Sequence, residues 1–167
     1  NSLTILVSLV HENEHLSEQF IKKLSKAYRY ILEQKEQTLV SLKTELEFIE
    51  SYTFLLKIRF ENKFEVQIEV PEEIQNHYHI APLTLQMLVE NAVKHNRMSV
   101  QEPLLIKIYA KENFLIIENP LQAREDAAPS TGVGLQNIVN RYSFLTELKA
   151  AYEVRQNLFV VHIPLLK

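Results

Sequence analysis

The first sixty residues contain neither glycine nor proline, and this stretch constrains the fold more than any other feature of the chain. Apolar residues recur there every three or four positions in two runs, so each run carries one apolar stripe at the helical period. Ser41 precedes the second run in an N-cap position, and Glu45 lies in its first turn. The stripes, which predict two long amphipathic helices after a short apolar segment at 3–10, are Leu16, Phe20, Leu24, Tyr28 and Ile31, then Leu42, Leu46, Ile49, Tyr52, Leu56 and Phe60.

The two predicted helices are joined through residues 33–40, a connection short enough for an antiparallel hairpin. A hairpin of two such helices cannot bury both apolar stripes by itself. We therefore expect it to pack against another domain or against a second copy of the chain.

After Phe60 the hydrophobic period changes to the alternation of a half-buried strand. The predicted order is three helices followed by βαββαββ. This is an α+β fold in which a helical arm, residues 1–61, precedes an α/β sandwich with a mixed sheet, residues 62–167. The predicted strands are 64–70, 104–111, 114–118, 151–155 and 158–164, with a hairpin turn at Gln156-Asn157; the helices are 82–95, opened by Pro82, and 134–145, and a loop covers 120–131.

Composition excludes several classes of protein. The 167 residues include no cysteine, which rules out a disulfide scaffold, a thiolate zinc site and a cysteine nucleophile. Two glycines are too few for a glycine-rich dinucleotide-binding domain. A net charge of −3 provides no basic surface, so we expect no nucleic-acid partner. The sequence has no apolar run of about 18 residues that would span a membrane, and it begins without Met or a signal peptide, as the interior of a longer protein would.

The first group of candidate functional residues lies near the end of the helix predicted over 82–95. Asn91 and His95 are one helical turn apart, and Glu90 and Lys94 lie beside them. An asparagine oxygen suits a hard cation such as Mg²⁺, a lysine offers a point charge to phosphate, and a glutamate can orient or deprotonate a hydroxyl or water. Solvated polar positions on an amphipathic helix are the simpler interpretation of the same spacing.

The second group lies where the polar loop meets the helix predicted over 134–145. Both glycines of the chain, Gly132 and Gly134, stand at this junction, beside Thr131 and Leu135. Glycines there let the backbone approach a phosphate, and the helix N-terminus favours an anion. An ordinary turn with an N-cap would have the same pattern, but the placement of all the glycine at one junction favours a functional interpretation.

These two groups, together with the helical region, follow the pattern of one known family. Residues 81–95 include Ala81-Pro82, Leu85-Gln86 and Leu88-Val89-Glu90-Asn91-Ala92-Val93-Lys94-His95, and residues 132–142 include Gly132-Val133-Gly134-Leu135-Gln136-Asn137-Ile138 and Arg141-Tyr142. The helical region adds Asn1-Ser2-Leu3, Leu24-Ser25, Tyr28-Arg29-Tyr30, Val40-Ser41-Leu42, Glu45-Leu46, Tyr52 and Arg59-Phe60. In order, and over nearly the whole chain, these segments resemble the transmitter region of LytS-like bacterial sensor histidine kinases, with its N box at 81–95 and its G2 box at 132–142.

The resemblance implies a fold, a reaction and partners. The helical arm would pair two copies in a homodimer, and the sandwich would be a GHKL (Bergerat) domain that binds ATP and Mg²⁺. The enzyme would be a protein-histidine kinase that transfers the γ-phosphoryl group of ATP to a histidine and then to a response regulator. The chain would be the cytoplasmic part of a bacterial protein anchored in the inner membrane.

The resemblance also implies roles for individual residues. Asn91 would hold Mg²⁺ and Lys94 would approach the phosphates, while Glu90, as the catalytic group, and His95 would lie beside the triphosphate. The phosphate-facing end of a lid over residues 120–131 would be formed by Thr131, Gly132, Gly134 and Leu135.

Two departures from the family pattern matter. The family's phosphoacceptor histidine would lie just before Asn1, and neither His11 nor His15 stands in its position, so we expect no autophosphorylation at the family's site within these residues. The family's G1 box, Asp-x-Gly-x-Gly, corresponds to residues 117–121, which lack both glycines. Glu118 stands about where the adenine-contacting Asp belongs, and Asn119 offers a side-chain amide. The alternative is therefore a non-catalytic, dimeric signalling module of the same fold, with weak or no ATP binding.

Overall fold

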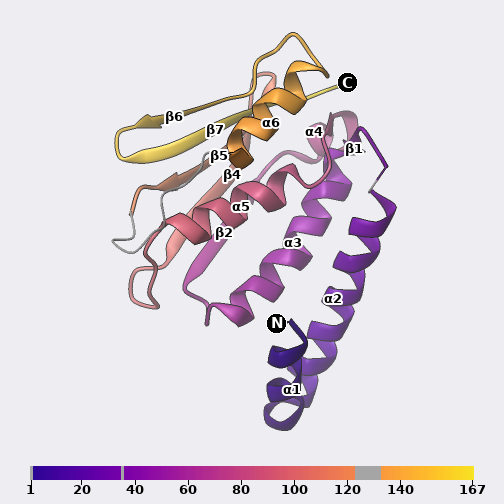
Figure 1. The fold of residues 1–167 in the computed structure, drawn as a ribbon, viewed down its shortest axis with the longest axis vertical. Coiled ribbons are helices and arrows are strands. Elements are labelled where there is room, and N and C mark those ends of the chain that lie inside the picture. Colours follow the sequence, from indigo (N-terminus) through magenta and orange to yellow (C-terminus); the bar gives the residue numbers. More distant parts are fainter. Residues whose placement is uncertain (1, 35, 123–132) are drawn as a thin grey trace.

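The computed structural model describes residues 2–34, 36–122 and 133–167 (Figure 1). Three helices come first, α1 (Ser2–Glu12), α2 (Glu14–Glu33) and α3 (Leu42–Arg59), as the apolar stripes predict. The Ser41 side chain caps α3 by accepting a hydrogen bond from the Thr44 amide at 3.1 Å, which confirms the predicted N-cap. Among the described residues, no helix combines the length and the apolar character that crossing a bilayer requires.

Helices α2 and α3 form the predicted hairpin, and α3 lies between α2 and the α/β part of the chain (Figure 1). The ring of Tyr30 on α2 stacks on Phe48 of α3 with 4.2 Å between the ring centroids. On its other side α3 contacts α4 (Glu72–His77), α5 (Thr84–His95) and β2 (Phe64–Glu69). The α/β part therefore covers one side of the hairpin. Packing against another part of the chain is one of the two arrangements that the apolar stripes predict, the other being packing against a second copy.

A five-stranded sheet forms the centre of the α/β part, with the strand order β2-β4-β5-β7-β6. Strand β2 pairs with β4 in parallel, and the other neighbours pair antiparallel, so the sheet is mixed as predicted. Gln156 and Asn157 take φ of 50° and 61° in the β6–β7 turn, which fits the predicted two-residue hairpin. The remaining bounds are β4 (Leu104–Lys111), β5 (Phe114–Pro120), β6 (Ala151–Arg155) and β7 (Leu158–Pro164).

Helices α5 and α6 (Val133–Ser143) lie over one face of this sheet (Figure 1). The face of α5 toward the core is formed by the residues that the sequence predicts for it, since Leu85, Leu88, Val89 and Ala92 are all buried. Tyr142 of α6 is fully buried, and its hydroxyl accepts a hydrogen bond from the Ala81 amide at 3.0 Å. Both helices are thus held on the sheet by apolar side chains.

The segment before α5 differs from the sequence expectation. Helix α4 and the short strand β3 (His79–Ile80) form between β2 and α5, where the sequence predicts no element, and β3 pairs with β1 (Val40–Ser41), which directly precedes α3. Pro82 does not open α5, because the helix begins at Thr84 and Leu83 takes a left-handed φ of 64° as its N-cap. The Pro82 carbonyl instead accepts a hydrogen bond from Arg141 Nη1 at 2.9 Å, so the turn before α5 is held by α6.

Candidate functional site

Four predicted site residues lie along one flank of α5. Glu90 and Lys94 are exposed, whereas Asn91 and His95 are half-buried beside them. In each pair the two residues are one helical turn apart, so all four side chains leave the helix on adjacent lines. The structure thus brings together the N-box residues that the sequence predicts to act together.

The start of α6 lies against Asn91. A Cβ built on Gly134 would lie 3.8 Å from Asn91 Nδ2 and 3.8 Å from the Met87 methyl carbon. These are ordinary contact distances, so the α6 backbone at Gly134 directly neighbours the Asn91 amide. Leu135 is half-buried and packs against the core, and Thr131 and Gly132 lie outside the described residues.

Glu118 and Asn119 lie on opposite faces of the sheet, because they follow each other on β5. Asn119 is 4% exposed and continues the row of Leu115 and Ile117, which pack into the core shared with α5 and α6. Glu118 is half-buried on the other face, where Tyr109 Oη donates a hydrogen bond to Glu118 Oε2 at 3.0 Å. Of the two predicted G1 residues, the structure places Asn119 on the face that carries the N box.

The amide of Asn119 has a defined orientation. Its Nδ2 donates a hydrogen bond to the Pro120 carbonyl at 2.8 Å. This bond leaves Oδ1 as the group that can accept a further hydrogen bond. A buried amide with its oxygen left to accept is suited to a ligand that carries an N–H donor.

Asn96 belongs to the same region, although the sequence analysis did not single it out. It follows α5 directly and is 4% exposed. Its Nδ2 donates to the Ala92 carbonyl at 2.9 Å, and its Oδ1 accepts from the Gln122 amide at 2.8 Å. The Arg97 amide donates to the Gln122 carbonyl at 2.6 Å. The end of α5 is therefore tied to the residues that follow β5, which brings Asn119 toward the N box.

Glu90 is held by its neighbours on two helices. Tyr52 Oη, on α3, donates a hydrogen bond to Glu90 Oε1, and Gln86 Nε2 donates to the same oxygen at 3.1 Å. Burial and the contact with Glu90 raise the pKa of Tyr52 above its ordinary range, so the hydroxyl keeps its proton and remains a donor at neutral pH. In the sequence, Tyr52 is a member of an apolar stripe and of the family pattern, and neither indicates this polar contact.

The surroundings of His95 favour its neutral form. Partial burial and the cationic Lys94 next to it both lower the pKa of His95 below its ordinary value. A neutral imidazole has one nitrogen that accepts and one that donates. By contrast His15, near the start of α2, is exposed, and its ring contacts Gln19 Nε2 at 3.0 Å.

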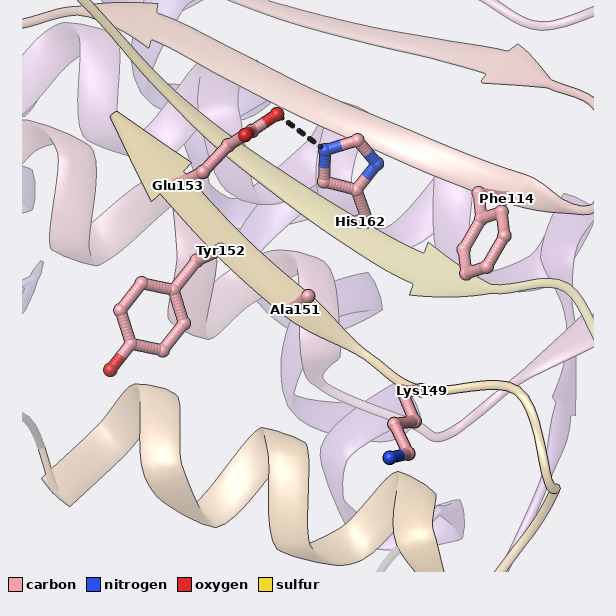
Figure 2. Close-up of a pocket in the computed structure, with 6 residues that line it drawn as sticks. All are labelled: Phe114, Lys149, Ala151, Tyr152, Glu153 and His162. Atoms are coloured by element: carbon pink, nitrogen blue, oxygen red, sulfur yellow. Dashed lines mark hydrogen bonds and ion pairs between the residues drawn. The ribbon is translucent and has the colours of Figure 1, made fainter. Parts of the chain in front are cut away.

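A separate hollow lies over β6 and β7 (Figure 2). Its volume is about 440 Å³, and the pair of Glu153 and His162, 3.4 Å apart, forms part of its lining. Figure 2 shows these two side chains pointing toward each other, while Tyr152 points away from them. The full lining is Phe114, Lys149, Ala151, Tyr152, Glu153 and His162, which includes none of the predicted site residues.

Comparison with known proteins identifies the family. Residues 1–64 match the model of a family described as Histidine kinase. An uncharacterized sensor-like histidine kinase of Staphylococcus epidermidis is 31% identical over 158 residues, which cover 84% of this chain and 30% of that protein. The sensor protein kinase HptS of Staphylococcus aureus is 31% identical over 118 residues, covering 70% of this chain and 22% of that protein.

The chain therefore spans less than a third of the length of these two relatives. Among solved structures, the Acinetobacter baumannii histidine kinase AdeS aligns with a TM-score of 0.45 and 15% identity, over 98% of this chain and 95% of that chain. The family match and the two relatives confirm the kind of protein that the sequence resembles: the chain belongs to the sensor histidine kinase family.

Proposed function

We propose that the chain binds ATP and Mg²⁺ in a GHKL-type site formed by α5, the end of β5 and the start of α6. The observation that carries this proposal is the 3.8 Å approach between the Asn91 amide and the position of a Cβ on Gly134. The Asn91 amide, whose oxygen suits Mg²⁺, and a helix N-terminus suited to phosphate are thereby neighbours, with Nδ2 as the nearer amide atom. These are the two groups that a triphosphate–Mg²⁺ complex needs at one place.

The residues present fit an Mg²⁺–triphosphate complex. Mg²⁺ keeps several of its waters and takes few protein ligands, so the half-buried Asn91 amide is a sufficient donor from this chain. When bound, the ion neutralises charge on the phosphate oxygens. Lys94 is exposed on the same flank and adds a positive charge for those oxygens, while the backbone N–H groups at the start of α6 orient them.

The proposed reaction is transfer of a phosphoryl group from ATP to a histidine outside residues 1–167. An imidazole nitrogen attacks the γ-phosphorus, the bond from phosphorus to the β,γ-bridging oxygen breaks, and ADP leaves. Glu90 is the catalytic group, since its exposed carboxylate can take up the proton that the imidazole loses. His95, whose lowered pKa favours the neutral imidazole, would lie beside the triphosphate, as the family resemblance implies. The phosphoryl group then passes to an aspartate of a response regulator.

We assign the contact with adenine to Asn119 in place of Glu118. Asn119 lies on the face of the sheet that carries the N box, and its Oδ1 remains to accept a hydrogen bond. The exocyclic amino group of adenine is a donor, whereas guanine presents a carbonyl at the same position. The acceptor therefore favours ATP over GTP.

The proposed assembly is a homodimer through the N-terminal helices. Ile21, Tyr28 and Leu32 on α2 are 46%, 58% and 72% exposed, and their spacings of seven and four place them on one helical face. A second copy would cover this face. A cytoplasmic position in a membrane-anchored bacterial parent follows from the same family assignment.

A non-catalytic signalling module is the second candidate. The observation that favours it is that Asn119 is uncharged and Glu118, the acidic residue of this segment, contacts Tyr109 on the other face of the sheet. A site with no carboxylate beside the adenine lacks the stronger, charge-assisted hydrogen bond to the adenine amino group. Such a chain would keep the dimer and relay a conformational change without turnover.

Titration calorimetry with ATP separates the two candidates. We expect heat of binding in the presence of Mg²⁺, and we expect Asn91→Ala to abolish the dependence on Mg²⁺ while the protein stays folded. Asn76→Ala, an exposed asparagine on α4, is the matched control and should bind as the unmodified chain does. No heat at millimolar nucleotide would exclude the ATP site and leave the signalling module. Full Mg²⁺-dependent binding by Asn91→Ala would exclude the role of that residue.

A further inference from the structure

The first turn of α5 is capped by a residue from another helix. Its own N-cap residue, Leu83, has a left-handed φ of 64° and supplies no capping side chain. Glu45 of α3 takes this place, because its carboxylate accepts hydrogen bonds from the Leu83 amide at 3.2 Å and the Leu85 amide at 3.1 Å. A carboxylate at a helix N-terminus satisfies unpaired N–H groups and interacts favourably with the helix dipole.

The same carboxylate is also bound to α2. Tyr30 Oη donates a hydrogen bond to Glu45 Oε2, the oxygen that also accepts from Leu83. Glu45 is 0% exposed and Tyr30 is 6% exposed, so water cannot replace either partner. Burial, together with the adjacent Glu45, raises the pKa of Tyr30, which keeps the hydroxyl protonated as a donor. One buried carboxylate thus connects three helices, α2, α3 and α5.

This connection resists separate movement of the helices. Burial raises the pKa of Glu45, while the hydrogen bonds from Tyr30, Leu83 and Leu85 oppose that rise. Loss of the Tyr30 bond leaves a buried carboxyl group with one partner fewer, which is costly. Tyr30 also stacks on Phe48, which stacks in turn on Tyr52 at 5.8 Å between centroids. Tyr52 then contacts Glu90. Helix α3 therefore contacts α5 at two places: Glu45 at the first turn and Tyr52 at Glu90. Helix α2 takes part in the first contact through Tyr30.

We propose that Tyr30 and Glu45 are positioning residues that couple the placement of α2 to the first turn of α5. Displacement of α2 along α3 changes the Tyr30 contact, and Glu45 passes this change to the amides of Leu83 and Leu85. The final step, from α5 to nucleotide affinity, rests on the proposed ATP site. The first step, from α2 to the start of α5, does not.

Hydrogen exchange of backbone amides in the chain without nucleotide tests the first step. Tyr30→Phe keeps the buried ring and removes only the hydroxyl. We expect it to accelerate exchange of the Leu83 and Leu85 amides by about tenfold, beyond any change in the slowest core amides, because the Glu45 carboxylate loses one of its anchors. Glu45→Gln, which removes an acceptor from the cap itself, should have a larger effect at the same amides.

Glu47→Gln is the matched control. Glu47 lies on α3 and faces α2, with Lys26 Nζ at 3.7 Å, but the pair is exposed and does not reach α5. It should leave exchange at the start of α5 unchanged. The proposal is overturned if Tyr30→Phe leaves the Leu83 and Leu85 amides unchanged, or if it accelerates exchange equally throughout the chain, which is the result expected of general destabilisation.

Binding of ATP with Mg²⁺ to the same variants tests the last step. We expect Tyr30→Phe to weaken binding several-fold and Glu47→Gln to leave it unchanged. If the unmodified chain binds no nucleotide, the proposed function fails while the exchange result still decides the coupling. If nucleotide binds and Tyr30→Phe changes exchange but not affinity, the coupling does not reach the site, and the regulatory half of the proposal is overturned.

Discussion

The hydroxyl of Tyr52 on α3 donates a hydrogen bond to the carboxylate of Glu90 on α5, so a helix of the N-terminal hairpin holds a side chain of the candidate site. Tyr52→Phe removes this donor and leaves the ring in place. Because Glu90 is exposed and keeps Gln86 as a partner, we expect a loss of only about 0.5–1.5 kcal/mol in the free energy of unfolding. Urea unfolding measures it.

Tyr152→Phe is the control for this variant, since it makes the same chemical change at a tyrosine that is 45% exposed on β6. It should leave the free energy of unfolding unchanged. Equal free energies of unfolding for the two variants would mean that the hydrogen bond from Tyr52 to Glu90 does not stabilise the folded chain.

Asn119→Asp should destabilise the chain although it exchanges only one non-hydrogen atom. Asn119 is 4% exposed, and its Nδ2 donates to the Pro120 carbonyl at 2.8 Å. The aspartate would place a buried oxygen against that carbonyl, at a cost of about 1–3 kcal/mol. The same change at Asn113, which is exposed between β4 and β5, should cost nothing. Chemical denaturation at pH 7 compares them, and equal midpoints would contradict the described orientation of the amide.

The stability of the chain should fall below neutral pH partly because of His95. Burial and Lys94 lower the pKa of His95 in the folded state. As pH falls through the ordinary histidine range, around pH 6.5, the unfolded chain binds a proton that the folded chain binds less readily, so stability decreases. His95→Gln removes this difference and should flatten the dependence between about pH 7.5 and 5.5. The free energy of unfolding is measured by urea denaturation at a series of pH values. If its dependence on pH is the same in His95→Gln, His95 is not responsible for the loss of stability.

Leu32→Glu should weaken the proposed homodimer. Leu32 is 72% exposed on the α2 face that also carries Ile21 and Tyr28, and a charge there would have to be buried in a dimer. We expect at least a tenfold increase in the dimer dissociation constant by analytical ultracentrifugation. Phe144→Glu, at an 89% exposed position after α6, is the matched control. If Phe144→Glu weakens the dimer and Leu32→Glu does not, the interface lies elsewhere.

The regular elements of this chain could be predicted because their sequence patterns are long. The stripes that begin at Leu16 and Leu42 each continue for several helical turns, and the strand that begins at Phe64 alternates over its whole length. Strands β1 and β3 have two residues each, and α4 has six. Segments this short contain too few residues to display a period, so tertiary contacts decide them.

The candidate site was predicted less completely than the fold, for two physical reasons. On a strand, adjacent residues face opposite sides, so assigning a role to Glu118 or to Asn119 depends on a register accurate to one residue. The second reason is that distant residues complete the site. In the sequence, Glu45 is an acidic residue in the first turn of a helix and part of the family pattern, and only the arrangement of α3 against α5 shows that it caps α5 at Leu85.

Helix α3 has a consequence for how this molecule can be divided and recombined. The sequence turns from helices to strands near residue 62, but Glu45 and Tyr52, the partners of α5, both lie before that point. A hybrid protein with a foreign helix pair joined at residue 62 would lose both contacts together with α3. A junction within residues 36–39 would keep them. Hybrids between relatives, whether they arise in evolution or by engineering, should therefore fold and function when the junction lies before α3 rather than after it.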